Sequence, residues 1–233
     1  MRRAQARLRL HEGERGKTST PGWIARRPSR MRCVGASERP KVNGDGYRAI
    51  DPLVYLSYFT RMSKLPIITL PDPMLRRVSA PVERVDLELL RLAADMLETM
   101  YAAPGIGLAA VQVGVPRRLV VLDVSEDEDE KRPLILINPE IVALGSEPRL
   151  HEEGCLSIPD FRLEIERPSA VTISYLDHEG ERRELAAEGL LATAIQHEID
   201  HLNGKLIVDF LSRLKRELVV KKLKKLPRGE VPL

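Results

Sequence analysis

The sequence lacks the features that stabilise secreted proteins and anchor membrane proteins. Its only two cysteines, Cys33 and Cys155, lie in unlike surroundings, so no disulfide framework is expected and a reducing, cytoplasmic compartment fits best. No apolar run reaches the roughly 20 residues that cross a bilayer, so no membrane partner is expected. The 233 residues are enough for one domain of moderate size with a substantial core.

The charge is distributed unevenly along the chain. Residues 1–61 hold 14 Lys or Arg against 5 Asp or Glu, a balance of +9, so the rest must carry −6 to give the net +3. The sequence pI of about 8.9 therefore comes from the first segment. It is not the signature of a folded domain that binds nucleic acid.

The segment 1–61 differs from the rest of the chain, because it is rich in Arg and interrupted by four prolines. Three interpretations remain open: a disordered basic arm, a transit segment that directs the protein to an organelle, or an upstream start, with translation beginning at Met62. The abrupt change in composition favours the third. We therefore predict an extension over 1–61, a catalytic domain over 62–226 and a tail over 227–233.

Hydrophobic periodicity within 62–226 predicts an α+β fold. Strands cluster in the middle of this region, with helices on either side. The predicted helices are 86–102, capped by Asp86, then 190–202 and 211–226. The predicted strands are 119–124, 134–137, 140–144, 163–166, 171–175 and 206–208.

The segment from Gln196 to His201 contains candidate metal ligands and a candidate acid/base. His197 and His201 are four residues apart, so on a helix both project from one face. Glu198 lies between them, which completes the H-E-x-x-H pattern of two metal ligands and a carboxylate that can accept a proton from water. The alternative is a buried helix that carries two histidines by chance.

Cys155 supplies a third candidate ligand. It follows Gly154 in a setting that resembles a loop beside a strand. Two imidazoles and one thiolate would leave a fourth coordination position open, as a catalytic metal requires. His178 falls in a predicted turn and is expected to be exposed, whereas the sequence leaves His151 open as a further ligand.

A glycine pair, Gly105 and Gly107, follows the first predicted helix. Paired glycines allow backbone to approach a ligand closely. The pattern is not a dinucleotide fingerprint, because the glycines follow a helix and the third glycine is missing. Gln112 ends this stretch with an amide that can donate to a developing oxyanion. The alternative is a tight turn into a buried segment.

Taken together, three segments resemble the peptide deformylase family. They read GIGLAAVQ over 105–112, EGCLS over 153–157 and QHEIDHLNG over 196–204. The family patterns, in the same order, are G-x-G-x-A-A-x-Q, E-G-C-L-S and Q-H-E-x-D-H-L-x-G. The resemblance extends from about residue 62 to about residue 226 and leaves 1–61 outside it.

The resemblance implies a fold, a reaction and a set of site residues. The fold is α+β, with mixed or antiparallel sheets around a central ligand-bearing helix and a C-terminal helix. The reaction is hydrolysis of the formyl group from the N-terminal formyl-methionine of new polypeptides, which releases formate. The metal ligands would be Cys155, His197 and His201, the acid/base Glu198, and the oxyanion donors Gln112 and the Leu156 N–H. The substrate-lining positions would be Gly105, Ile106, Gly107, Glu153, Arg162 and Leu190. The metal would be Fe²⁺, with Zn²⁺, Ni²⁺ or Co²⁺ as substitutes.

The partners are inferred from this reaction and from the charge of the last helix. N-formyl-methionyl nascent peptides would be the substrates. The basic helix 211–226 is either a solvated face or a surface that docks on ribosomal RNA. Two rival functions use the same motif, namely a zinc peptidase and a binding protein with a structural zinc.

Overall fold

The computed structural model describes residues 63–125 and 131–224. The predicted extension 1–61 and tail 227–233 lie outside the described residues. The elements, in chain order, are the 3-10 helix η1 (Pro73–Arg76), α2 (Leu87–Ala102), β1 (Gly107–Ala109), the 3-10 helix η2 (Ala110–Val113), β2 (Leu119–Leu122), β3 (Leu134–Leu144), β4 (Pro148–Cys155), β5 (Ile158–Pro168), β6 (Ala170–Leu176), β7 (Arg182–Glu188), α3 (Gly189–Leu202), the 3-10 helix η3 (Ile207–Phe210) and α4 (Arg213–Leu223).

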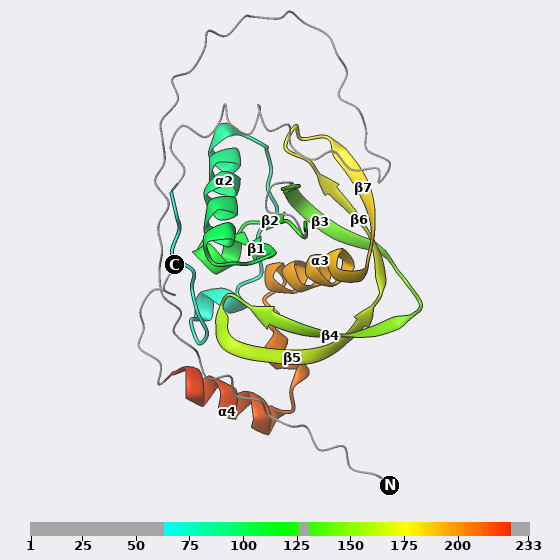
Figure 1. The fold of residues 1–233 in the computed structure, drawn as a ribbon. Helices are drawn as coiled ribbons and strands as arrows, with labels where there is room; N and C mark the ends of the chain where they lie inside the picture. The colour runs from blue at the N-terminus through cyan, green and yellow to red at the C-terminus, as the bar shows by residue number, and fades with distance from the viewer. Residues whose placement is uncertain (1–62, 126–130, 225–233) are drawn as a thin grey trace, which may run out of the picture. The chain divides into compact units, whose positions relative to one another are not determined.

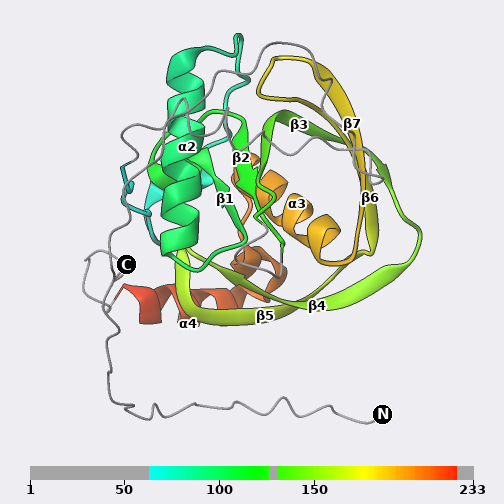
Figure 2. The same ribbon diagram turned by 45° about the horizontal axis from the view of Figure 1, so that its top comes forward.

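Two antiparallel sheets form the β part of the fold. One has five strands in the order β1-β2-β3-β6-β7, and the other is the hairpin β4-β5. In Figures 1 and 2, α3 lies inside the curve of β6, β7 and the hairpin, while α2 lies outside β1 and β2. The predicted α+β class with a central helix is confirmed. No helix in the described ranges has the length and apolar character needed to cross a membrane.

The strand β2 and the first half of β3 are buried on both faces, because α2 and α3 cover opposite sides of this part of the sheet. Successive side chains of a strand point to opposite faces. Along β2, Val120 and Leu122 join the apolar cluster that includes α3, whereas Leu119 and Val121 join the cluster that includes α2. The α3 helix is thereby enclosed in the core.

The termini of both long helices follow local sequence signals. Asp86 caps α2 by accepting a hydrogen bond from the Leu89 N–H at 3.0 Å. Gly204 follows the end of α3 with a left-handed φ of +72°. A Cβ at this position would lie 2.5 Å from the Arg76 carbonyl oxygen, so only glycine fits where the chain leaves the helix.

A third apolar cluster lies between the β4–β5 hairpin and the C-terminal elements. It includes Ile158 and Ile165 of β5, Val208 of η3 and Leu223 of α4. In Figure 1, α4 runs alongside β5. This packing fixes the hairpin whose first strand ends at Cys155.

Three of the predicted elements differ from those observed. Residues 134–144 form one strand rather than two, because Asn138 adopts a φ of +51° at an irregularity in the register and the chain continues. Residues 206–208 were predicted as a strand, but 207–210 form the 3-10 helix η3. The last helix begins at Arg213. The strand β4 was not predicted, because Glu152-Glu153-Gly154 interrupts any alternation.

Candidate metal centre

The helix α3 presents two histidines to one point. His197 and His201 lie one turn apart with ring centroids 5.0 Å apart and planes inclined by 67°. Both are buried, at 9% and 1% exposure. The predicted helical spacing thus places two imidazoles on one face, inside the core.

Cys155 completes the cluster from another part of the fold. It is the last residue of β4, and its Sγ lies 3.2 Å from His201 Nε2. The ligand atoms of Cys155, His197 and His201 lie within 4.8 Å of one another, and these three residues form the one group of this kind in the described ranges. His151 and His178 are not members of that group. Three protein ligands leave a coordination position for water or substrate.

The donor set suits a transition metal. One thiolate and two imidazoles are ligands for Fe²⁺, Zn²⁺, Co²⁺ or Ni²⁺ rather than for Ca²⁺ or Mg²⁺. Burial, followed by the charges of His197 and Arg167, places the pKa of His201 well below its usual value. Its imidazole is therefore neutral at neutral pH. Burial lowers the pKa of His197, but its contacts with Cys155 and Glu153 outweigh burial and raise that pKa well above its usual value, so a metal would displace a proton there.

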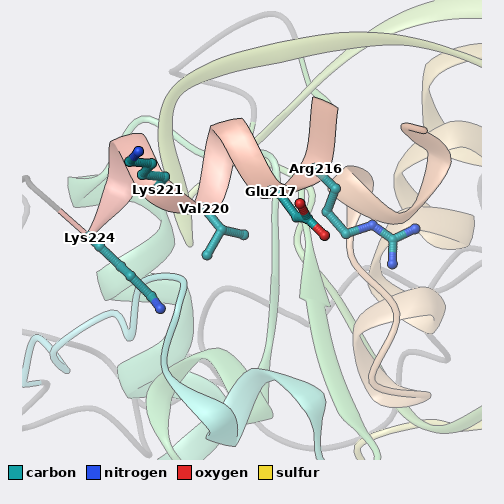
Figure 3. A pocket seen from close by; sticks show the side chains of 5 residues that line it. All are labelled: Arg216, Glu217, Val220, Lys221 and Lys224. Carbon is teal, nitrogen blue, oxygen red and sulfur yellow. The ribbon is translucent and has the colours of Figure 1, made fainter. Parts of the chain in front are cut away.

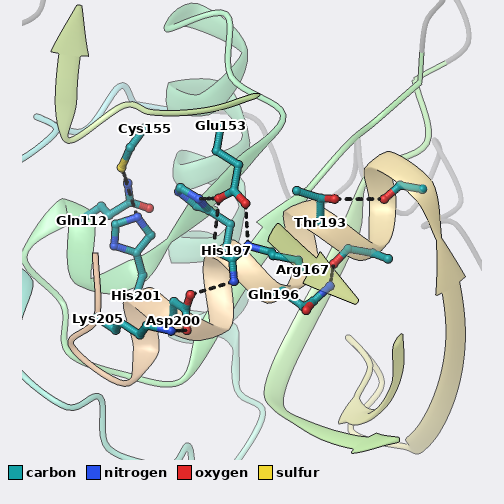
Figure 4. A network of polar contacts seen from close by, with 12 residues as sticks. Gln112, Glu153, Cys155, Arg167, Thr193, Gln196, His197, Asp200, His201 and Lys205 are labelled. Carbon is teal, nitrogen blue, oxygen red and sulfur yellow. Dashed lines mark hydrogen bonds and ion pairs between the residues drawn. The ribbon is translucent and has the colours of Figure 1, made fainter. Parts of the chain in front are cut away.

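A buried ion-pair network holds His197 in place (Figure 4). Glu153 accepts a hydrogen bond from His197 Nδ1 at 2.9 Å and two from Arg167, at 2.5 and 3.1 Å. Arg167 also donates to Asp200 at 2.9 Å. Burial raises the pKa of Glu153, but the bonds from His197 and Arg167 outweigh it, so the pKa is lowered. Because Nδ1 is engaged, Nε2 of His197 is the nitrogen available to a metal.

The sequence had placed Glu153 among the substrate-lining residues. In the structure its side chain is 5% exposed and both carboxylate oxygens are engaged by His197 and Arg167. Arg167 itself carried no signal in the sequence. It lies in an alternating stretch before Pro168, and its partners are 14 and 33 residues away.

Gln112 lies beside the sulfur of Cys155. Its Oε1 accepts a hydrogen bond from the Ala109 N–H at 2.8 Å, which directs Nε2 toward Ser157 Oγ at 3.1 Å and Cys155 Sγ at 3.8 Å. The predicted oxyanion donor is thus 1% exposed, with its amide orientation set by the backbone of β1. Ser157 is a contact that sequence reasoning did not single out.

Glu198 is the most isolated carboxylate of the centre. It is 4% exposed, and its Oε2 has no hydrogen-bond partner among the described residues. Burial raises its pKa to about 7. A carboxyl group whose pKa is near neutrality can both take up and release a proton at pH 7.

The glycine pair passes close to this centre. A Cβ on Gly107 would lie 2.5 Å from Glu198 Oε1, and one on Gly105 would lie 2.7 Å from Leu156 Cδ1. Between them, the Ile106 side chain is 43% exposed. Glycine at 105 and 107 therefore permits the close approach that the sequence suggested.

The other predicted substrate positions lie farther along the same elements. Arg162 pairs with Gly154 in the β4–β5 register, one residue from Cys155, and the Arg162 side chain lies against Gly154. Leu190 is 49% exposed in the first turn of α3, about two turns before His197. Leu156 packs beside the α2 cluster.

A separate hollow lies along α4 and contains none of the predicted site residues. Its lining consists of basic and aliphatic side chains with one carboxylate (Figure 3), from Arg216, Glu217, Val220, Lys221 and Lys224. It is therefore a feature of the C-terminal helix rather than of the metal centre.

A thiolate, two imidazoles and an isolated buried carboxylate around one helix define the site of a metal-dependent hydrolase. The family model of polypeptide deformylase matches residues 64–217. This chain belongs to that family, whose members are hydrolases that remove the N-formyl group from nascent peptides.

Relatives and solved structures agree with the family model. The peptide deformylase of Rhizobium meliloti is 58% identical over 164 residues, which cover 70% of this chain and 94% of that protein. The peptide deformylase of Agrobacterium fabrum is 55% identical over 170 residues, which cover 73% of this chain and 100% of that protein. The structure of peptide deformylase from Ehrlichia chaffeensis in complex with actinonin matches at a TM-score of 0.69 and 44% identity, covering 72% and 100%. A Met-Ala-Ser-bound peptide deformylase from Acinetobacter baumannii matches at a TM-score of 0.62 and 36% identity. The match covers 65% of this chain and 100% of that chain.

Proposed function

We propose that Cys155, His197 and His201 hold one divalent metal, Fe²⁺ in the native protein, and that Glu198 is the acid/base of deformylation. The observation that carries this proposal is the set of three ligand atoms within 4.8 Å of one another, beside an isolated buried carboxylate. The substrates are peptides that begin with N-formyl-methionine. When bound, the metal supplies Lewis-acid chemistry that makes water a nucleophile near neutral pH.

Proton transfer falls to Glu198. It takes a proton from the attacking water as the oxygen bonds to the formyl carbon. The carbon–nitrogen bond then breaks, formate leaves, and Glu198 returns the proton to the departing amine. The pKa of about 7, which burial produces, suits both steps.

Two groups hold the charge that develops on the formyl oxygen. The Gln112 Nε2 is directed toward the centre by the Ala109 N–H, and the Leu156 N–H follows Cys155 directly along the chain. Because they are fixed before the reaction, these donors need no reorganisation as the charge forms.

The peptide is proposed to lie between β1 and the β4–β5 hairpin. Gly105, Ile106 and Gly107 line one side, Arg162 flanks Gly154 on the other, and Leu190 borders the site. The Met-Ala-Ser ligand of the Acinetobacter relative supports a methionine at the first position. We assign Glu153 a positioning role, because its carboxylate is engaged by His197 and Arg167.

We propose that residues 62–226 make up the catalytic domain, preceded by an extension over 1–61 and followed by a tail over 227–233. The family match over 64–217 supports this division. The cytoplasm is the compartment that the reaction implies, because nascent chains are made there.

The test compares wild type with Glu198→Gln. Both proteins receive formyl-Met-Ala-Ser and unformylated Met-Ala-Ser, and metal content is measured on the same samples. We expect wild type to release formate from the first peptide alone, and the variant to keep its metal but lose about 10²–10⁴-fold in rate. Glu164→Gln, at an exposed carboxylate of β5, is the matched control.

Three outcomes would contradict the proposal. Cleavage within the unformylated peptide would support a zinc peptidase instead. A fourth protein ligand would support a structural zinc site. Full turnover by Glu198→Gln would remove Glu198 from the mechanism.

We further propose that α4 docks on ribosomal RNA. Lys221 and Lys222 are exposed near the end of α4, with Lys215 on the same helix and Lys224 directly after it. A polyanion attracts such a surface in a salt-dependent manner. Charge reversal of Lys221 and Lys222 should weaken co-sedimentation with ribosomes at low salt. Reversal of the exposed Arg77 and Arg91 is the control, and equal effects of both pairs would contradict the proposal.

A further inference from the structure

Asp123 is a buried carboxylate outside the metal centre that gathers several hydrogen bonds. It directly follows β2 and is 6% exposed. Its Oδ2 accepts from the Tyr101 hydroxyl at 2.6 Å and the Arg132 N–H at 3.1 Å. Its Oδ1 accepts from the Ser125 N–H at 3.0 Å and the Ser125 hydroxyl at 2.5 Å. These four hydrogen bonds to one side chain fix its position firmly.

The backbone of the same residue holds the start of β1. The Asp123 N–H donates to the Ile106 carbonyl at 3.0 Å, which extends the pairing of Gly107 with Leu122. Tyr101, which binds the Asp123 carboxylate, lies in the last turn of α2. Asp123 therefore ties the end of α2 and the start of β1 to one point.

The segment between these two attachments leads directly to the reacting groups. A Cβ on Gly105 would lie 2.7 Å from the Leu156 side chain, and one on Gly107 would lie 2.5 Å from Glu198 Oε1. Such tight packing leaves no room on that side, so release of the segment shifts the strand away from the metal centre. The contacts that Ile106 and Gly107 offer a bound peptide would move with the strand, so such a shift would weaken peptide binding.

We propose that Asp123 is a positioning residue for substrate binding, which acts by holding Ile106 and Gly107 at the register where the formyl-peptide binds. The inference rests on the proposed function, in which these residues line the substrate. Asp123 contacts neither the metal ligands nor Glu198 in any hydrogen bond of the described residues. Its loss should therefore weaken peptide binding and spare the chemical step.

Asp177 offers a matched control in a distant turn. It is 9% exposed and accepts from the Glu179 and Glu181 N–H groups, each at 2.9 Å, and from Arg183 at 2.8 Å. It thus organises the β6–β7 turn much as Asp123 organises the β1–β2 region. Asp177→Asn removes a comparable network without touching β1.

The experiment measures KM and kcat for formyl-Met-Ala-Ser with metal-loaded protein, together with metal content. Asp123→Asn should raise KM about tenfold and leave kcat and metal content within about twofold, because it removes binding that substrate and transition state share. Tyr101→Phe deletes only the hydroxyl that binds Asp123 and should raise KM about threefold. Asp177→Asn should leave KM unchanged.

Equal KM values for Asp123→Asn and Asp177→Asn would overturn the inference, as would a loss of kcat or of metal equal to the change in KM. If Asp123→Asn does not fold, Tyr101→Phe decides, and an unchanged KM there would overturn the inference too. Ile106→Ala separates the substrate-lining role of Ile106 from the positioning role of Asp123. A raised KM in Ile106→Ala with an unchanged KM in the Asp123 and Tyr101 variants would reject Asp123 alone. An unchanged KM in Ile106→Ala would reject the substrate-lining role and the inference with it.

Discussion

The helices α2 and α3 pack on opposite faces of the same sheet, yet α2 buries almost only apolar side chains and α3 buries apolar and polar side chains together. The buried residues of α2 are apolar or Ala, with Thr99 as the one polar exception. Those of α3 include Gln196, His197, Glu198 and His201. The α2 helix therefore contributes packing to the core, whereas α3 also carries the reactive groups of the metal centre.

The difference extends to how each helix is stabilised. The α2 helix begins at a side-chain cap from its own neighbour, Asp86, whereas the residue before α3 provides none. The polar groups of α3 depend on partners from other strands, chiefly Glu153 and Arg167. Buried polar groups destabilise a fold unless they are paired, so α3 needs the rest of the fold more than α2 does.

The largest expected effect is on activity and comes from α3. His201→Ala removes one of three metal ligands, so metal binding should fail. The rate of deformylation should drop by about 10³-fold or more, which corresponds to a rise of several kcal/mol in the activation free energy. Metal analysis and a formate-release assay on the same sample measure this. Full activity in His201→Ala would contradict the claim that α3 carries the chemistry and α2 does not.

The next effect concerns the network that supports α3. Arg167→Leu leaves the Glu153 carboxylate buried without its main partner, which should cost about 3–5 kcal/mol of unfolding free energy. Urea denaturation measures the loss. Arg213→Leu, at an exposed i,i+4 pair with Glu217, is the control and should change stability little. Equal losses in the two variants would contradict the dependence of α3 on this network.

A substitution in α2 should affect stability without affecting chemistry. Leu97 is fully buried, so Leu97→Ala should cost about 2–5 kcal/mol through lost contacts and a cavity. At a temperature where the variant remains folded, kcat per folded molecule should match wild type. A selective fall in kcat with full metal content would show that α2 also shapes the reacting groups.

The smallest effect is the acid sensitivity of the α2 cap. The hydrogen bond from the Leu89 N–H lowers the pKa of Asp86, so its carboxylate stabilises the fold above about pH 4. That stabilisation is lost as the pH falls through the lowered folded-state pKa. Thermal unfolding of wild type and Asp86→Asn at pH 7 and pH 3 should differ less at pH 3. An unchanged difference would argue against an ionised cap.

Local patterns predicted the parts of this comparison that depend on neighbours in the chain. The α2 cap, the helix over 190–202 and the facing histidines of α3 all follow from spacings of a few residues. The strand β4 was missed because its Glu-Glu-Gly sequence carries no alternation. A short apolar run at 206–208 fits a strand as well as the 3-10 helix that forms.

The supporting contacts of the centre could not be predicted in the same way. Arg167 acts through partners brought together only by the fold, and no neighbour in sequence indicates its role. Ser157 belongs to the EGCLS segment, but its hydrogen bond with Gln112 forms only in the fold. Glu153 was recognised as belonging to the site, but its bonds to His197 and Arg167 could not be foreseen. The three motifs therefore located the ligands, and the structure supplied what orients them.

The most direct test of the metal centre is X-ray absorption at the metal edge of protein purified without air, with metal content measured on the same sample. We expect one metal per chain, with one sulfur and two imidazole nitrogens as its protein ligands, and no sulfur signal in Cys155→Ser. Metal bound without sulfur in the wild type, or with a fourth protein ligand, would contradict the catalytic centre assigned to Cys155, His197 and His201.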